Sequence, residues 1–172
     1  MRHPLAMQSS PLPPEVRTSR LLLRRQRPAD ASLIKQAVDA SLEHLKTSVA
    51  WAQTAPFSLT ALAHRLTDSA ASFDAGTEWV FTILDPSEAF VVGAAALEPG
   101  EPALCALVGR EVIEVGYWLR ADATGNGYAT EATAALIDLA FARLGARRVA
   151  ICHDPSNARS AGETTSVSAG MS

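Results

Sequence analysis

The chain has 172 residues, of which 48% are hydrophobic and 19% are charged, and its formal net charge is -3 at pH 7. This length fits one domain with a substantial core, and the composition is globular rather than disordered. The mildly negative charge gives no basis for binding nucleic acid or an anionic membrane, so neither partner is expected.

The start of the chain and its cysteines bear on localisation. Residues 1–16 contain four prolines but no apolar signal-peptide core, so a flexible arm is expected there. The longest apolar stretch, residues 89–97, is too short to span a bilayer. Two cysteines, Cys105 and Cys152, are typical of reduced thiols rather than of a disulfide framework. Together these features predict a cytoplasmic protein.

The first half of the chain predicts one strand and two helices. Residues 19–25 contain three successive leucines and are expected to form a strand. Asp30 is a candidate N-cap for a helix with apolar residues at helical spacing, Ile34, Val38, Leu42 and Leu45. A second helix is predicted from Ser58 to Phe73, ending at Gly76, with a stripe formed by Leu59, Leu62, Leu66, Ala70 and Phe73.

The second half predicts strands around one long helix. Aromatic and β-branched residues indicate strands at 78–84, 89–97, 111–119 and 147–153. An apolar helix is expected from Tyr128 to Leu144, with Gly145 closing it. Because strand 111–119, this helix and strand 147–153 form a βαβ unit, the two strands should run parallel.

The loop that opens this helix carries the first chemical signal. Gly125-Asn126-Gly127 precedes Tyr128, and small residues at a helix N-terminus expose unpaired N–H groups that hold phosphate oxygens. A site for an anionic, pyrophosphate-bearing ligand is one interpretation, and a simple tight turn is the other. A Walker A loop is excluded because Gly-Lys-Ser/Thr is absent, and Thr130 does not fit a dinucleotide fingerprint.

Longer stretches make the signal more specific. Residues 115–132, VGYWLRADATGNGYATEA, resemble the acetyl-CoA-binding segment of GNAT N-acetyltransferases, and in particular their RimJ/RimL branch. Residues 17–24 resemble that branch's opening strand, and residues 41–45 followed by Trp51 resemble its substrate-side helix. Asn157-Ala158-Arg159-Ser160 matches its Asn-x-x-Ser element. In the right order, these pieces cover residues 17 to 160.

The resemblance implies a fold, a reaction and a cofactor site. The fold class is α/β, with a mixed, mostly antiparallel sheet and a parallel βαβ unit at the acetyl-CoA site. The reaction is direct acetyl transfer from acetyl-CoA to an amine, either a protein N-terminus or a small amine, without a metal. The residues expected to bind the co-substrate are Val115, Tyr117, Trp118, Leu119, Thr124, Gly125, Asn126, Gly127, Tyr128, Ala129, Thr130 and Asn157.

Two residues are candidates for proton transfer. Glu114 lies on the polar face of strand 111–119, where the family often has an acid, and could take the proton of the amine directly or through water. Ser160 could protonate the leaving thiolate by its Asn-x-x-Ser position. The alternatives remain a surface carboxylate for Glu114, a helix cap or loop serine for Ser160, and a turn-stabilising role for Asn157.

This sequence departs from the family pattern in two places. Asp122 occupies the position of the family's Arg or Gln, which puts an acid beside the expected pyrophosphate. After Ser160, residues 161–172 show no apolar stripe, so we expect a disordered tail where relatives continue with a helix and strands. One hypothesis is an acetyltransferase domain at 17–160, truncated or frame-shifted; an inactive remnant that at most binds CoA is the alternative.

Overall fold

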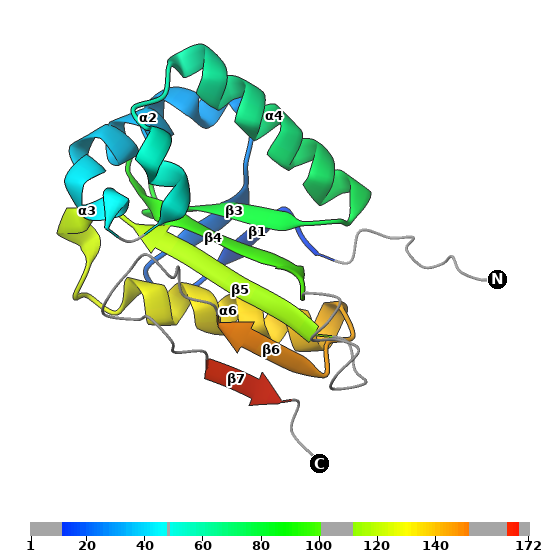
Figure 1. Cartoon of the computed structure of the whole chain (residues 1–172). Helices are drawn as coiled ribbons and strands as arrows, with labels where there is room; N and C mark the ends of the chain where they lie inside the picture. The colour runs from blue at the N-terminus through cyan, green and yellow to red at the C-terminus, as the bar shows by residue number, and fades with distance from the viewer. Residues whose placement is uncertain (1–11, 48, 101–111, 152–164, 169–172) are drawn as a thin grey trace.

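Seven strands form one sheet whose spatial order follows the order of the chain, β1 to β7, with helices on both faces (Figure 1). This computed structural model describes residues 12–47, 49–100, 112–151 and 165–168. All neighbouring strands pair antiparallel except β5 and β6, which are parallel. The fold is therefore the mixed α/β sheet expected from the sequence.

The sheet begins earlier than expected. Strand β1 (Glu15–Arg17) pairs antiparallel with β2 (Leu22–Arg25), so one predicted strand is two, joined by a turn. Leu12, within the segment expected to be a flexible arm, is 3% exposed and packs in the core. The burial of one large side chain holds this segment to the domain.

The first predicted helix is divided. After the 3-10 turn η1 (Pro28–Asp30), α2 (Ala31–Ala40) and α3 (Leu42–Lys46) are separated at Ser41, which is buried. Asp30 stands at the N-cap but makes no side-chain capping bond, because its carboxylate accepts from the buried Arg24 guanidinium at 2.8 Å. A charge-assisted bond between buried partners has displaced the weaker backbone cap.

The second helix, α4 (Leu59–Ala75), follows the 3-10 segment η2 (Ala50–Thr54) and begins and ends close to the predicted positions. Ser58 accepts a hydrogen bond from the Ala61 amide at 3.0 Å, and Gly76 closes the helix in the left-handed conformation. Four of the five stripe residues are buried, but Leu59, the first residue of the helix, is 49% exposed.

Three long strands form the centre of the sheet: β3 (Trp79–Leu84), β4 (Val91–Pro99) and β5 (Val112–Leu119). The close approach of β4 to β5 explains Gly93. A Cβ at this position would lie 2.0 Å from the carbonyl oxygen of Trp118, a contact that no side chain can adopt. Gly93 thereby sets how β5 lies against its neighbour.

The predicted βαβ unit is confirmed. A short 3-10 turn, η3 (Ala121–Ala123), leads from β5 to α6 (Tyr128–Arg143), and β6 (Arg148–Ile151) then pairs parallel with β5. The register joins Val112 to Arg148 and Val115 to Ile151. Only the first half of β5 is therefore paired with β6 among the described residues.

Beyond β6, the structure differs from the expectation of an unstructured tail. Strand β7 (Thr165–Ser168) pairs antiparallel with β6, with Val149 opposite Val167. A disordered tail after Ser160 would leave strand 147–153 without an outer neighbour. In the structure, the backbone groups on the outer edge of β6 are paired instead, which an edge strand favours whatever the side chains of its partner.

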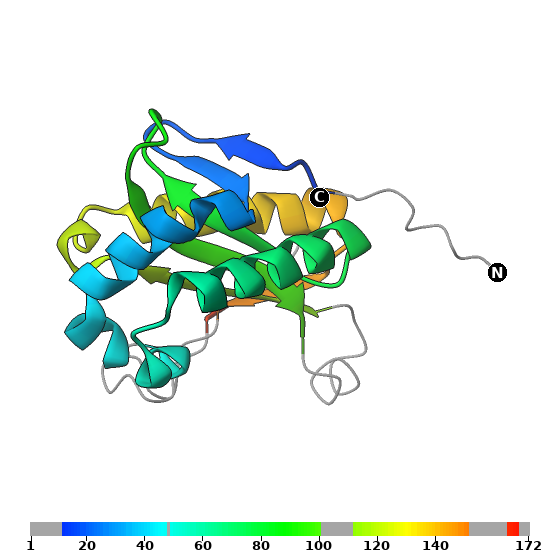
Figure 2. The same cartoon turned by 90° about the horizontal axis from the view of Figure 1, so that it is seen from above.

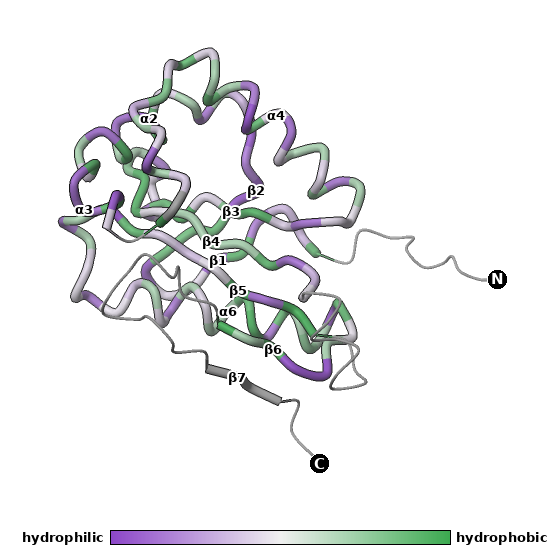
Figure 3. The backbone as a smooth tube through the Cα atoms, viewed as in Figure 1, coloured by the Kyte–Doolittle hydropathy of each residue, from purple (hydrophilic) through white to green (hydrophobic). Residues whose placement is uncertain are grey.

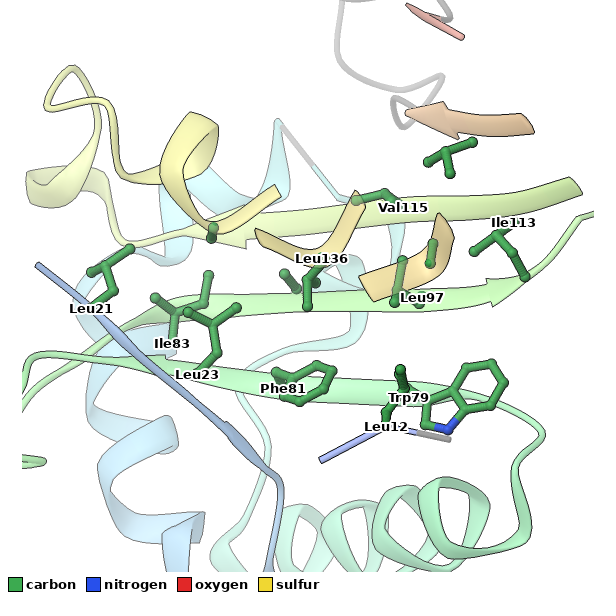
Figure 4. Packing of buried hydrophobic residues seen from close by; sticks show 14 of the residues in the cluster. Leu12, Leu21, Leu23, Trp79, Phe81, Ile83, Leu97, Ile113, Val115 and Leu136 are labelled. Carbon is green, nitrogen blue, oxygen red and sulfur yellow. The ribbon is translucent and has the colours of Figure 1, made fainter. Parts of the chain in front are cut away.

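The two faces of the sheet bury separate cores. On one face, α6 packs on residues from β2 to β6, and Figure 4 shows Leu136 among the core side chains of the sheet, with Val115 and Leu97 on either side. On the other face, α2, α3 and α4 cover a second core, and Figure 2 shows these helices lying across the strands. Hydrophilic and hydrophobic residues alternate along α4, as in a helix with one buried side (Figure 3).

Candidate active site

In the part of the chain that the structure describes, the second half of β5 has a strand partner on one side only. Gly100 donates to the Val112 carbonyl and Arg120 donates to the Val92 carbonyl, so the even-numbered peptide groups of β5 point to β4. By alternation, odd-numbered ones point to the β6 side. Pairing with β6 stops at Val115, so the N–H and C=O groups of Tyr117 and Leu119 face no described strand there.

The start of α6 lies at the same end of β5. Gly125 and Gly127 both have positive φ, 81° and 80°, which turns the loop sharply into the helix. The first backbone bond of the helix joins the Glu131 amide to the Gly127 carbonyl, so the amides of the preceding turn have no partner within α6. Donors of this kind and the helix dipole favour a bound anion.

Side chains brace this loop from within. The Asn126 amide donates to the carbonyls of Ala123 and Thr124 at 3.1 and 3.3 Å, and the Thr124 hydroxyl donates to the Ala121 carbonyl at 2.9 Å. Their side chains are thus engaged with the loop, and their backbone groups are what the loop offers to a ligand. The buried Ser41 hydroxyl accepts from the Ala121 amide at 2.8 Å, which ties the loop to the α2–α3 break.

The acid at the family's Arg or Gln position is paired. Asp122 accepts two hydrogen bonds from Arg120, at 3.0 and 3.2 Å, and the Arg120 guanidinium also lies over the Phe90 ring. The hydrogen bond from Arg120 lowers the pKa of Asp122, so this carboxylate is ionised. The positive charge of Arg120 balances its negative charge. The departure from the family pattern therefore adds less negative charge to the loop than the sequence suggests.

A second ion pair fixes the first turn of α6 to the β1–β2 turn. The Glu131 carboxylate accepts from the Thr18 hydroxyl, from the Arg20 amide at 2.8 Å and from the Arg20 guanidinium at 2.7 Å. The same guanidinium lies 4.6 Å from the centre of the Tyr128 ring. Burial raises the pKa of Glu131, but the bonds from Thr18 and Arg20 outweigh it and lower the pKa to about 2.

On the face of the sheet away from α6, β5 borders a cavity of about 620 Å³. Its floor consists of small residues, Ala94 and Ala96 on β4 and Gly116 on β5, and α2 and α4 form its roof. At one end, Trp51 packs edge-on against Trp118 with ring centres 5.7 Å apart. This volume is typical of pockets for small molecules or short peptide ends.

Carboxylates stand at the other end of the cavity. Glu98 and Glu114 are directly opposite each other on β4 and β5, so their side chains share this face of the sheet. Glu78 precedes β3 next to them and lines the cavity with Glu98. Desolvation, followed by the charges of Glu78 and Glu114, raises the pKa of Glu98. The cluster is not apparent from the sequence, because it depends on the register of three strands.

The predicted residues fall into two groups around β5. The exposed peptide edge at Tyr117 and Leu119 and the α6 start, from Thr124 to Thr130, lie at one end of the βαβ unit. Trp118 differs, since its ring lies in the cavity on the opposite face and its peptide group points to β4. Glu114 is on the cavity face, while Asn157 and Ser160 lie outside the described residues.

No helix in the described part of the chain is both long and apolar enough to cross a membrane. Within the same residues, no group of three or more His, Cys, Asp or Glu side chains is placed to hold a metal ion.

A family model and several solved structures match this chain. The Acetyltransferase (GNAT) domain model matches residues 20–164. RimL, a ribosomal L7/L12 alpha-N-protein acetyltransferase solved with coenzyme A, superposes with a TM-score of 0.65 at 20% identity, over 78% of this chain and 71% of its own. No curated protein matches significantly.

Two ribosomal-protein acetyltransferases from Vibrio have the same fold. A putative ribosomal-protein-serine acetyltransferase from Vibrio cholerae gives a TM-score of 0.68 at 23% identity, over 87% of this chain and 80% of its own. The ribosomal-protein-S5-alanine acetyltransferase from Vibrio fischeri gives 0.66 at 18% identity, over 85% and 77%.

The family model covers most of the chain, and the sheet, the βαβ unit and the loop before α6 agree with it. The chain belongs to the GNAT acetyltransferase family. By family it is an acetyl-CoA-dependent acyltransferase, and acetyl-CoA is its co-substrate.

Proposed function

We propose that this chain transfers the acetyl group of acetyl-CoA to a primary amine bound in the cavity over Gly116, by direct attack in a ternary complex. One observation carries the proposal. Within the described residues, β5 has no strand partner beyond Val115 on its β6 side, and at Gly116 it borders a cavity on one face of the sheet. A thioester lying along that edge would meet an amine in the cavity without crossing the sheet.

The co-substrate half of the site uses mainly backbone groups. The amides between Gly125 and Thr130 would hold the pyrophosphate, and the peptide groups of Tyr117 and Leu119 would pair with the pantetheine arm as a neighbouring strand does. Val115 is the last residue of β5 paired with β6 and marks where the arm would begin to replace that strand. Asn157 remains a proposed contact by its sequence position.

In the reaction, the amine nitrogen attacks the thioester carbon, the C–N bond forms, and the C–S bond breaks to release coenzyme A as a thiolate. Glu114 would take the proton from the amine, directly or through water, since its side chain is on the cavity side of the sheet, opposite Glu98. A backbone N–H near Tyr117 would polarise the carbonyl, and Ser160 would return a proton to the thiolate.

The cavity volume and the structural neighbours both bear on which amine is the acceptor. The cavity volume fits a small amine or the first residues of a peptide. Structural neighbours named as ribosomal-protein N-acetyltransferases make a protein N-terminus a reasonable first choice to assay. An α-amino group with a pKa near 8 requires only a mild base, whereas a lysine amine near 10.4 requires a stronger one.

Two measurements on the full chain test this function. Calorimetry measures acetyl-CoA binding, and release of the coenzyme A thiol measures turnover with peptides and small amines. We expect binding, and turnover that falls at least tenfold in Glu114→Gln while acetyl-CoA affinity is kept. Absence of acetyl-CoA binding contradicts the proposal. Binding without thiol release for any amine favours the alternative, an inactive member of the family.

A further inference from the structure

The side chain of Arg20, in the turn between β1 and β2, lies against the loop that opens α6. A Cβ built on Gly127 would be 3.4 Å from the Arg20 Nη2 atom, so the guanidinium borders the last glycine of this loop. The guanidinium also lies 4.6 Å from the centre of the ring of Tyr128, the first residue of α6. A permanently charged group is therefore placed beside the amides that the loop offers to an anion.

Glu131 binds this guanidinium through a single nitrogen. The Arg20 Nε atom donates to Glu131 Oε1 at 2.7 Å, while Glu131 Oε2 accepts from the Arg20 amide at 2.8 Å and from the Thr18 hydroxyl. Among the described residues, none accepts a hydrogen bond from the terminal nitrogens Nη1 and Nη2, and the Arg20 side chain is 47% exposed. These two nitrogens form the edge of the guanidinium that matches a pair of phosphate oxygens, in a side chain that is already held in place.

A second arginine beside the loop, Arg120, is engaged with the protein itself. Its Nε and Nη2 atoms donate to the two carboxylate oxygens of Asp122, at 3.0 and 3.2 Å, and its guanidinium lies over the Phe90 ring. The Arg120 side chain is only 16% exposed. Of these two arginines, Arg20 is therefore the one that can donate hydrogen bonds to a negatively charged ligand at the start of α6.

We propose that Arg20 is a phosphate-binding residue for acetyl-CoA, and that its Nη1 and Nη2 atoms donate to a phosphate group beside the amides of the α6 loop. The pyrophosphate and the 3′-phosphate of the co-substrate present oxygens of the same chemistry, and either can be the partner. Glu131 and Tyr128 are positioning residues, because they hold the guanidinium at the loop before the ligand binds. The inference rests on the co-substrate of the family and does not depend on which amine is acetylated.

Calorimetry of the full chain with acetyl-CoA tests this role. Arg20→Gln should raise the Kd about tenfold, since a charge-assisted hydrogen bond from a half-exposed side chain is lost. The difference from wild type should shrink as the ionic strength rises from about 0.05 M to 0.5 M, because salt screens the charges. Arg27→Gln is the matched control, since Arg27 is 51% exposed and is also ion-paired through Nε, to Asp30. It should leave the Kd unchanged.

The partner of the ion pair separates phosphate binding from the attachment of α6. Arg20→Gln and Glu131→Gln break the same pair, so a purely structural role of Arg20 predicts the same rise in Kd for both. Phosphate binding predicts a rise in Arg20→Gln only, because Glu131→Gln keeps the positive charge. The ligand 3′-dephospho-acetyl-CoA then identifies the phosphate. If Arg20→Gln has no effect on its Kd, Arg20 binds the 3′-phosphate, and if the effect stays about tenfold, Arg20 binds the pyrophosphate.

Labelling of the wild-type chain gives a readout that does not depend on how the variants fold. Phenylglyoxal modifies exposed guanidinium groups, and acetyl-CoA should protect Arg20 while Arg27 stays reactive, as measured by mass spectrometry of the digested chain. The role of Arg20 is overturned if Arg20→Gln binds acetyl-CoA as tightly as wild type, if Glu131→Gln weakens binding equally, or if the ligand gives no protection. These three results leave the proposed acetyl transfer untouched. If the wild-type chain binds no acetyl-CoA, the proposed function and this inference fail together.

Discussion

The attachment of α6 to the β1–β2 turn depends on one carboxylate, and Glu131→Gln should weaken it measurably. The ordinary pKa of 4.5 falls to about 2 in the folded protein, because the Thr18 and Arg20 bonds outweigh burial. At 1.36 kcal/mol per pKa unit, the ionised form contributes at most about 3 kcal/mol. Since the Arg20 side chain is 47% exposed, solvent screens part of this, and we expect a loss of about 2 kcal/mol.

The pH dependence follows from the direction of the shift. A carboxylate with a lowered folded pKa stabilises the protein above its unfolded pKa, and this contribution is lost as pH falls from 4.5 toward 2. Urea unfolding should therefore show a difference between wild type and Glu131→Gln that is constant from pH 6 to 8. By pH 3.5 the difference should be smaller by about 1 kcal/mol. The melting temperature at pH 7 should drop by about 4–8 °C.

An exposed ion pair provides the control. Asp74 accepts two hydrogen bonds from Arg25, at 2.9 and 2.6 Å, but its side chain is 63% exposed. Asp74→Asn should cost less than about 1 kcal/mol, as surface pairs do. If Glu131→Gln costs no more than Asp74→Asn, or if its effect is independent of pH, the account of the α6 attachment is wrong.

Three further substitutions test the site and the core. Gly116→Ala should keep the melting temperature, since an added Cβ meets nothing within 4 Å, but should lower thiol release about tenfold or more by intruding on the cavity; unchanged turnover would exclude Gly116 from the reacting centre. Gly127→Ala and its control Gly145→Ala, both at positive φ, should each lose about 1–2 kcal/mol in urea unfolding, and calorimetry should detect weaker acetyl-CoA binding only in Gly127→Ala. Thr82→Val should raise the melting temperature by about 2–4 °C, because the fully buried Thr82 hydroxyl has no partner; a lower value would indicate a hidden bond.

Periodic patterns in the sequence predicted much of the fold. The alternation in residues 111–119 predicts that Ile113, Val115, Tyr117 and Leu119 share one face, and the structure packs Ile113, Val115 and Leu119 under α6, whereas Tyr117 is 37% exposed. Ser58 and Gly76 are local signals whose chemistry acts within a few residues, so the ends of α4 could be read directly. The parallel pairing of β5 with β6 followed from the handedness and length of the connection.

Features that depend on distant partners could not be read in this way. Strand β1 is three residues long, with two charged ones, and becomes a strand only by pairing with β2. The break at Ser41 depends on a bond to Ala121, 80 residues further along the chain.

For the same reason, the contiguous part of the candidate site could be predicted from the sequence, and the part assembled from separate strands could not. The loop from Thr124 to Thr130 is contiguous and carries a recognisable pattern of glycines, so the sequence alone could propose it as the co-substrate site. Gln26, Glu78 and Glu98 belong to three separate strands or their flanks, and only the register brings them to one cavity. The assignment of Trp118 to the co-substrate stays a prediction; its ring lines the cavity with Trp51, a contact between distant segments that the sequence does not show.

The alternation of β5 has a consequence for how this protein can change over evolution. Side chains from Val112 to Leu119 contribute in turn to the α6 core and to the cavity. Inserting or deleting a single residue there would exchange the two sets, driving Glu114 toward the α6 core and an isoleucine or valine into the cavity. Related chains should therefore differ in residue type along this strand but keep its length, and gain or lose residues in the connections at either end.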